Sequence, residues 1–287
     1  MNAFLLLAAS LTLAVKTGMS PDANPLAVAP IDGLRGAVEV VDAKGRTVPC
    51  AVRTDGNGRR FVAFRLGAVE ILRRLEFTVR ECAGAQGDVP GIPRVLPGMN
   101  LIANPDLSLR DADGDPVGWW PSPGFGQKKP WTDENRGNVR AKDGTVGFRD
   151  GCWVTYLQGL EEGHVYRFSF DGLSQAKHAG LTLWYCGKGG KYPDPLPGVG
   201  NYKSSHGITA TGSWTHVEDT SFLYFDKAAK RHVFNCRELL PGTGAAYLQV
   251  YAEEGRIGIR NLRYEDVTLD SGIGVEVPVL RNAQQDL

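Results

Sequence analysis

An excess of charge of either sign is absent from this chain. Its 287 residues include 32 Lys and Arg and 32 Asp and Glu, so the formal net charge is zero. A chain without net charge has no long-range field that attracts polyanions, and no locally basic stripe compensates for this. Nucleic acid is therefore not predicted as a partner.

Hydrophobic runs long enough to cross a bilayer are also absent, because a membrane helix needs about 20 consecutive apolar residues. The apolar run from Phe4 to Val15 has about a dozen residues, the length of the apolar part of a signal peptide. We therefore assign residues 1–29 to a signal peptide and leader, and predict a secreted, extracellular or cell-surface protein with no membrane span in its mature form. A buried strand or an uncleaved anchor over the same residues is the alternative.

Cysteine is scarce, with five residues and no CxxC spacing, which argues against a structural zinc site. Cys50 and Cys82 could form a disulfide in the N-terminal part, and two of Cys152, Cys186 and Cys236 could form another. Buried free thiols are an equally good reading, because cysteine is among the most buried residue types.

Known arrangements of catalytic or metal-binding residues are missing as well. The five histidines form no HExxH pattern, and no serine or cysteine stands in a GxSxG-like setting. Asp111, Asp113 and Asp115 alternate, but no complete calcium loop follows, so a solvated turn is the favoured interpretation. We predict no catalytic residue, no metal and no cofactor.

Turn residues, by contrast, are plentiful: 36 glycines and 17 prolines are scattered between short apolar runs. Between Ala37 and Val79, alternating apolar segments are separated by Lys-Gly and Asn-Gly turns, which is typical of hairpins. The chain is therefore predicted to be all-β, with a small Ig-like β-sandwich followed by a larger jelly-roll β-sandwich. The expected boundaries are 30–83 for the small domain, 84–98 for a Gly/Pro-rich linker, 99–268 for the large domain and 269–287 for a C-terminal tail.

The large domain contains a series of short motifs in a particular order. They are NLIANPDLS from Asn100, a GWW turn at Gly118, the strand pair WVTYLQGL and VYRFSFDGLS, the segment GSWTHV, and the closing IGIRNL. In this order, residues 100–267 resemble the jelly-roll carbohydrate-binding modules of families 4, 9 and 22 and the wider galactose-binding-like sandwich. The resemblance implies the fold and non-catalytic binding of a glycan or polysaccharide. In that family, acidic residues at the places of Ser108 and Arg260 often help to hold a structural calcium, so this site is in doubt here.

Strand periodicity separates core residues from surface residues, because successive side chains point to opposite faces. Tyr166, Phe168 and Phe170 form one core series, and Leu248, Val250 and Ala252 form another. The opposite faces carry aromatic and polar side chains, which suit the stacking and hydrogen bonding that sugars require. If the strands are adjacent as in the resembling modules, the ligand-binding residues are Trp184, Tyr251, Glu253, Gln249, Tyr247, Arg167, Asp171 and Gln158.

Loops at the rim of the sandwich are a second candidate site. They carry Trp119, Trp120, Trp131, Tyr192 and Tyr202, and we expect at least one tryptophan of the Gly118-Trp119-Trp120 turn to be buried.

Two other classes of function remain open. The segment Gly274–Leu280 reads as a short strand in need of a partner, so the chain could be an assembly subunit that associates with itself or another protein through its C-terminal tail. A glycosidase or lyase is the less favoured reading; it would require paired carboxylates, for which Asp171 and Glu253 are the candidates.

Overall fold

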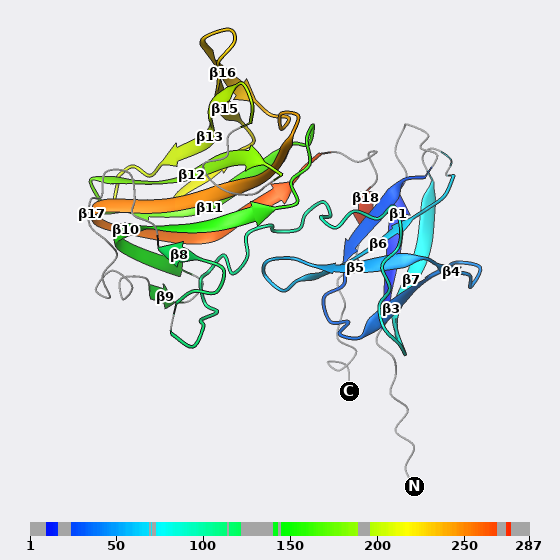
Figure 1. Cartoon of the computed structure of the whole chain (residues 1–287). Helices are drawn as coiled ribbons and strands as arrows, with labels where there is room; N and C mark the ends of the chain where they lie inside the picture. Colours follow the sequence, from blue (N-terminus) through cyan, green and yellow to red (C-terminus); the bar gives the residue numbers. More distant parts are fainter. Residues whose placement is uncertain are drawn as a thin grey trace. The chain divides into compact units, whose positions relative to one another are not determined.

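The computed structural model describes residues 10–16, 24–68, 70, 73–113, 115–121, 140–142, 145–188, 196–268 and 274–276. All regular secondary structure in these residues is β-strand, which confirms the predicted all-β class (Figure 1). The chain forms two compact units, one from Met1–Pro97 with Leu269–Leu287 and one from Gly98–Thr268. None of the described residues forms a helix with the length and hydrophobicity needed to span a membrane.

The small unit contains two sheets. The larger sheet has the strand order β18-β1-β7-β3-β4 and the smaller one has the order β2-β6-β5. The strands are β1 (Ser10–Lys16), β2 (Leu26–Pro30), β3 (Ala37–Asp42), β4 (Thr47–Val48), β5 (Cys50–Thr54), β6 (Arg60–Arg65), β7 (Arg74–Cys82) and β18 (Gly274–Glu276). Apolar side chains from both sheets form one core, so the unit is a β-sandwich.

Residues assigned to a leader on sequence grounds lie inside this sandwich. β1 pairs with β7 on one side and β18 on the other, and Leu11, Leu13 and Val15 are buried in the core. In the structure, Ser10–Lys16 is therefore a buried strand, which is the alternative that the sequence analysis gave for this segment. An apolar strand of this kind has the same composition as the apolar part of a signal peptide, so composition alone does not separate the two.

The segments predicted as linker and tail also belong to the small unit. Gln86 accepts a hydrogen bond from the backbone N–H of Val38 at 2.9 Å and donates one to the carbonyl of Cys50 at 3.2 Å. The strand expected near Gly274 pairs antiparallel with β1 of the same chain. Gly274–Glu276 therefore has a partner strand in its own chain and lies at the edge of the sheet, and association of the tail with another subunit stays a prediction.

The large unit is a sandwich built around the long strand β17 (Thr243–Asp266) (Figure 1). The first part of β17 pairs with β12 and the second part with β11, while β10 follows it along both parts. The other strands extend this arrangement in the order β14-β11-β17-β12-β13-β15-β16, with β8 and β9 paired to β10. Their bounds are β8 (Trp120–Pro121), β9 (Arg140–Lys142), β10 (Thr145–Gln158), β11 (Tyr166–Ser174), β12 (His178–Gly187), β13 (Val199–Gly207), β14 (Thr215–Asp219), β15 (Phe222–Asp226) and β16 (Arg231–Cys236).

An irregularity in β17 separates its two parts. Glu254 and Gly255 both have positive φ, at 52° and 151°. A side chain at position 255 would collide with the carbonyl oxygen of Gln175, so the position requires glycine. Phe168 and Phe170 come from β11, which pairs with the second part of β17, and Leu248 and Val250 come from the first part. All four side chains belong to one core. The core therefore lies between two layers, each with its own outer face.

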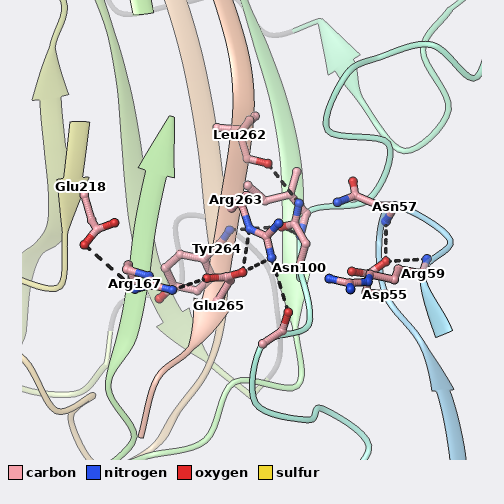
Figure 2. A network of polar contacts seen from close by, with 12 residues as sticks. Asp55, Asn57, Arg59, Asn100, Arg167, Glu218, Leu262, Arg263, Tyr264 and Glu265 are labelled. Atoms are coloured by element: carbon pink, nitrogen blue, oxygen red, sulfur yellow. Dashed lines mark hydrogen bonds and ion pairs between the residues drawn. The ribbon is translucent and has the colours of Figure 1, made fainter. Parts of the chain in front are cut away.

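The opening motif of the large unit stabilises the ends of strands. The Asn100 side chain donates to the carbonyl of Leu262 and accepts from the N–H groups of Ile102 and Tyr264 (Figure 2). Asn104 has positive φ, and its amide bonds Leu109 twice. The two asparagines of the NLIANP segment thus supply backbone hydrogen bonds that no strand provides.

Candidate functional site: the aromatic face of the large unit

The predicted alternation along the first part of β17 is present in the structure. Leu248, Val250 and Ala252 are fully buried in the core, whereas Tyr247, Gln249 and Tyr251 lie on the other side of the strand. A second, smaller apolar cluster forms on that outer side. It contains Cys152, Val154 and Tyr247, with Tyr156, Trp184 and Tyr251 packed against it.

Strand register places the outward side chains in rows across the sheet. In one row, Tyr156 of β10 is opposite Tyr247, which is opposite Trp184 of β12, and Lys203 of β13 follows. In the next row, Val154 is flanked by Trp120 of β8 and by Gln249. We call this surface the aromatic face, formed by Trp120, Tyr156, Gln158, Thr182, Trp184, Lys203, Ser205, Tyr247, Gln249, Tyr251 and Glu253.

Edge-on ring contacts hold the aromatic residues at one side of this face. Tyr156 lies between Trp120 and Tyr247, with ring centroids 5.8 Å and 5.2 Å away and steeply inclined ring planes. Such contacts fix ring orientation before any ligand arrives. Trp120 is 50% exposed although it is a large apolar side chain, which makes it the most open ring of the three.

Gln249, by contrast, is occupied by the protein itself. Its amide oxygen accepts from the indole N–H of Trp184 at 3.2 Å, and its amide nitrogen donates to Sγ of Cys152 at 3.1 Å. The side chain is only 7% exposed, and burial raises the pKa of the Cys152 thiol to about 12, so this thiol stays protonated. Gln249 therefore anchors Trp184. We had expected it to bind sugar hydroxyls, but its amide group is engaged by these two side chains.

Trp184 is half-buried and one face of its ring is covered. The ammonium of Lys203 lies 4.8 Å from the ring centroid, a cation–π contact between neighbouring strands. The expectation that Trp184 is an open stacking plate is thus modified, because the lysine occupies the position that a sugar ring would take.

Tyr251 and Glu253 continue the face toward the bend of β17. Tyr251 is opposite Cys152 and Gly180. Its ring packs against Gly180 so closely that a Cβ atom at position 180 would lie 3.0 Å from the Tyr251 hydroxyl. Burial, and to a lesser extent the charge of Glu253, raises the pKa of Tyr251. Gln158 is exposed at the opposite end, two residues beyond Tyr156 on the same side of β10.

Arg167 and Asp171 do not join this face, which corrects the predicted grouping. They lie on β11, which pairs with the second part of β17, and they point away from the core on the outer side of the other layer. Arg167 bonds Glu265 at 2.8 Å and lies 4.0 Å from Glu218, while Arg263 also pairs with Glu265 (Figure 2). The wrong grouping arose because β11 and β12 flank different parts of one long strand.

Asp171 belongs to a separate polar cluster. It accepts hydrogen bonds from His216 at 2.7 Å, Asn261 at 2.8 Å and Arg260 at 3.2 Å, and chiefly the bond from His216 holds the pKa of this carboxyl below its usual value. The guanidinium of Arg260 also lies 4.3 Å from the centroid of Trp214. Asp171 and Glu253 therefore occupy opposite outer faces and do not face each other as a carboxylate pair.

The positions where the resembling modules hold calcium have other partners here. Arg260 is engaged as described, and the Ser108 hydroxyl donates to the carboxylate of Asp106 at 2.8 Å. Asp111 accepts from the N–H groups of Asp113 and Asp115, as in the predicted turn. Within the described ranges, no three His, Cys, Asp or Glu side chains gather in a way that could hold a metal ion. All five cysteines are free.

The rim loops contribute one residue to the face. Trp119 is buried at 2% exposure and donates to the carbonyl of Ala103, as expected for one tryptophan of the turn, whereas Trp120 is open. Tyr202 is buried in the core. Trp131 and Tyr192 lie outside the described residues.

Sequence reasoning overlooked Lys203 altogether. The signal that could have found it is the alternation in β13, where Tyr202 and Ser204 are buried and Lys203 and Ser205 lie on the other side. Trp120 was predicted only as a residue of the rim loops, and Tyr156 was not among the predicted ligand-binding residues, because their contact depends on the pairing of β8 with β10.

No protein-family model and no curated protein matches the chain, but solved structures do. A structure described as CBM4 has 12% identity and a TM-score of 0.34, covering 57% of this chain and 99% of that chain. TmCBM61, solved with beta-1,4-galactotriose, has 18% identity and a TM-score of 0.32, covering 59% and 99%. The enzymatically active domain of tailspike protein 4 from bacteriophage CBA120 has 12% identity and a TM-score of 0.36; 58% of this chain is covered, but only 21% of that chain.

The solved neighbours thus include carbohydrate-binding modules of β-sandwich fold, the kind of protein that residues 100–267 resemble in their motifs. With TM-scores this low, the neighbours do not locate a site. The candidate site depends on the geometry of this chain.

Proposed function

We propose that the large unit binds polysaccharide on its aromatic face without cleaving it. The observation that carries this proposal is the group of outward-facing rings Trp120, Tyr156 and Tyr247 on one sheet, of which Trp120 is half-exposed. A flat apolar plate beside polar side chains matches a sugar, which has an apolar ring face and a rim of hydroxyls. Tyr251, Gln158, Ser205 and Glu253 supply the polar groups.

Binding without catalysis is proposed because the two carboxylates that the sequence offered as a catalytic pair, Asp171 and Glu253, do not face each other. Glycosidases place two carboxyl groups about 5–10 Å apart across the scissile bond. Asp171, the candidate partner of Glu253, lies on the other layer in a cluster with His216 and Arg260. Polysaccharides are mostly found outside the cell, so we further propose that the protein works in the extracellular space or at the cell surface.

The test is binding of the full chain to a panel of polysaccharides by affinity gel electrophoresis and calorimetry. Trp120→Ala should weaken binding roughly tenfold or more, because exposed aromatic anchors dominate such interfaces. Trp214→Ala is the matched control: it removes a 37% exposed tryptophan from the outer side of the other layer. If both variants bind as the unchanged protein does, or if both lose binding equally, the aromatic face is not the site. New reducing ends or unsaturated products would overturn the non-catalytic part of the proposal.

A further inference from the structure

Lys203 is held in a defined position on the aromatic face. It lies on β13 opposite Trp184, and its ammonium is 4.8 Å from the indole centroid. Trp184 is itself fixed by its hydrogen bond to Gln249, which in turn bonds Cys152. A chain of contacts over four neighbouring strands thus orients this one ammonium group, which reduces the entropy that a ligand would lose by ordering it.

The charge of Lys203 is not neutralised by an acidic partner in the part of the chain that the structure describes. Other basic side chains of the large unit do have such partners: Lys177 pairs with Glu254 at 3.1 Å and Arg167 pairs with Glu265 at 2.8 Å. A cation–π contact leaves the ammonium able to donate hydrogen bonds away from the ring. Lys203 is therefore ready to receive an anion.

The surroundings of Lys203 favour an anion on a sugar. Ser205 follows two residues later on the same side of β13, and its hydroxyl is 2.9 Å from that of Thr182. This side of the face thus combines two hydroxyls with the positive charge of Lys203.

Glu253 gives the face a direction. It lies six residues beyond Tyr247 on β17, roughly 20 Å along the strand from the row that contains Lys203. An acidic ligand is repelled near Glu253 and attracted near Lys203. It would therefore lie along the row Tyr156, Tyr247, Trp184 and Lys203, which crosses four strands and spans roughly 14 Å.

We infer that the aromatic face selects acidic polysaccharides, with Lys203 binding the carboxylate of a uronic acid or the sulfate of a sulfated sugar. The inference rests on the proposed function and adds the class of ligand. Trp184 then acts as a positioning residue for Lys203.

Two matched pairs of polysaccharides test this in the full chain. Polygalacturonate and its methyl ester share a backbone and differ in charge, and carrageenan and agarose provide the corresponding comparison for sulfate. The acidic member of at least one pair should bind more tightly at low salt, and added sodium chloride should reduce that difference. The pair that shows the preference identifies carboxylate or sulfate as the bound group.

Lys203→Met removes the ammonium and keeps an apolar stem over Trp184. The substitution should weaken the affinity for the preferred acidic polymer roughly tenfold. The affinity for the neutral member of the same pair should stay unchanged. Lys177→Met is the control, because it removes a lysine whose ion pair with Glu254 is exposed and lies away from the row.

The outcomes separate the two proposals. If neutral and acidic members bind equally, or if Lys203→Met weakens both members of a pair alike, the selectivity for acid is wrong while polysaccharide binding stands. If the chain binds no polysaccharide in the panel or in these pairs, the proposed function itself fails and this inference fails with it.

Discussion

At the scale of single residues, the aromatic face shows that an outward direction does not make a side chain available. Gln249 and Trp184 both point away from the core, yet one is bonded at both amide atoms and the other is covered by Lys203. Trp120 and Tyr251 retain exposed surface, so these two rings and the ammonium of Lys203 are the groups that can contact a ligand. Availability depends on contacts between neighbouring strands, which alternation along one strand does not reveal.

Gly180 offers a test of how closely this face is packed. A methyl group at this position would lie 2.5 Å from the carbonyl oxygen of His206 and 3.0 Å from the Tyr251 hydroxyl. Gly180→Ala should therefore lower the free energy of unfolding of the large unit by about 1–3 kcal/mol, the usual range for overpacking. Denaturant unfolding followed by tryptophan fluorescence measures it.

Gly207 is the control, because it is opposite Gly180 on β13 and a methyl group there would come no closer than 4.0 Å to its nearest neighbour, the Ala179 carbonyl. Equal unfolding midpoints for Gly180→Ala and Gly207→Ala would contradict the close approach of β12 to its neighbours.

At the scale of elements, the sequence predicted the strands and their inner faces well. The alternating core residues of β11 and of the first part of β17 are buried as expected, because period-2 hydrophobicity is a local property. Which strand lies beside which is a tertiary property. β17 continues past Gly255 into a second layer, so Asp171 lies beside Arg260 and not beside Tyr251. Of the eight residues predicted to share one face, six do so, whereas Arg167 and Asp171 lie on the other layer.

β1 is the element whose role the sequence left open, and its contribution can be measured. Leu13 is fully buried in the small sandwich, between sheets that both contribute to the core. Leu13→Ala should cost about 2–5 kcal/mol of the free energy of unfolding of that unit. Thr12→Ala is the matched control, because Thr12 is exposed on the other side of the same strand. A Leu13→Ala protein as stable as the control would show that β1 is not part of the folded protein in solution.

At the scale of the whole molecule, the two units are built differently along the chain. The large unit is one continuous segment, Gly98–Thr268, whereas the small unit is assembled from both ends of the sequence, with β18 beside β1. Each unit has its own sheets and its own core. Two separate cooperative units are therefore expected, each with an unfolding equilibrium of its own.

Calorimetry of the full chain should accordingly show two unfolding transitions. An acidic polysaccharide that binds the aromatic face stabilises only the unit that contains it, by about 2.7 kcal/mol when the free ligand is about 100-fold above Kd. The ligand should raise the midpoint temperature of the transition whose midpoint Gly180→Ala lowers. It should leave unchanged the midpoint temperature of the transition that Leu13→Ala lowers. A single transition that responds to both substitutions would mean that the units unfold as one. If the ligand raises only the midpoint temperature of the transition that Leu13→Ala lowers, the binding site lies in the small sandwich.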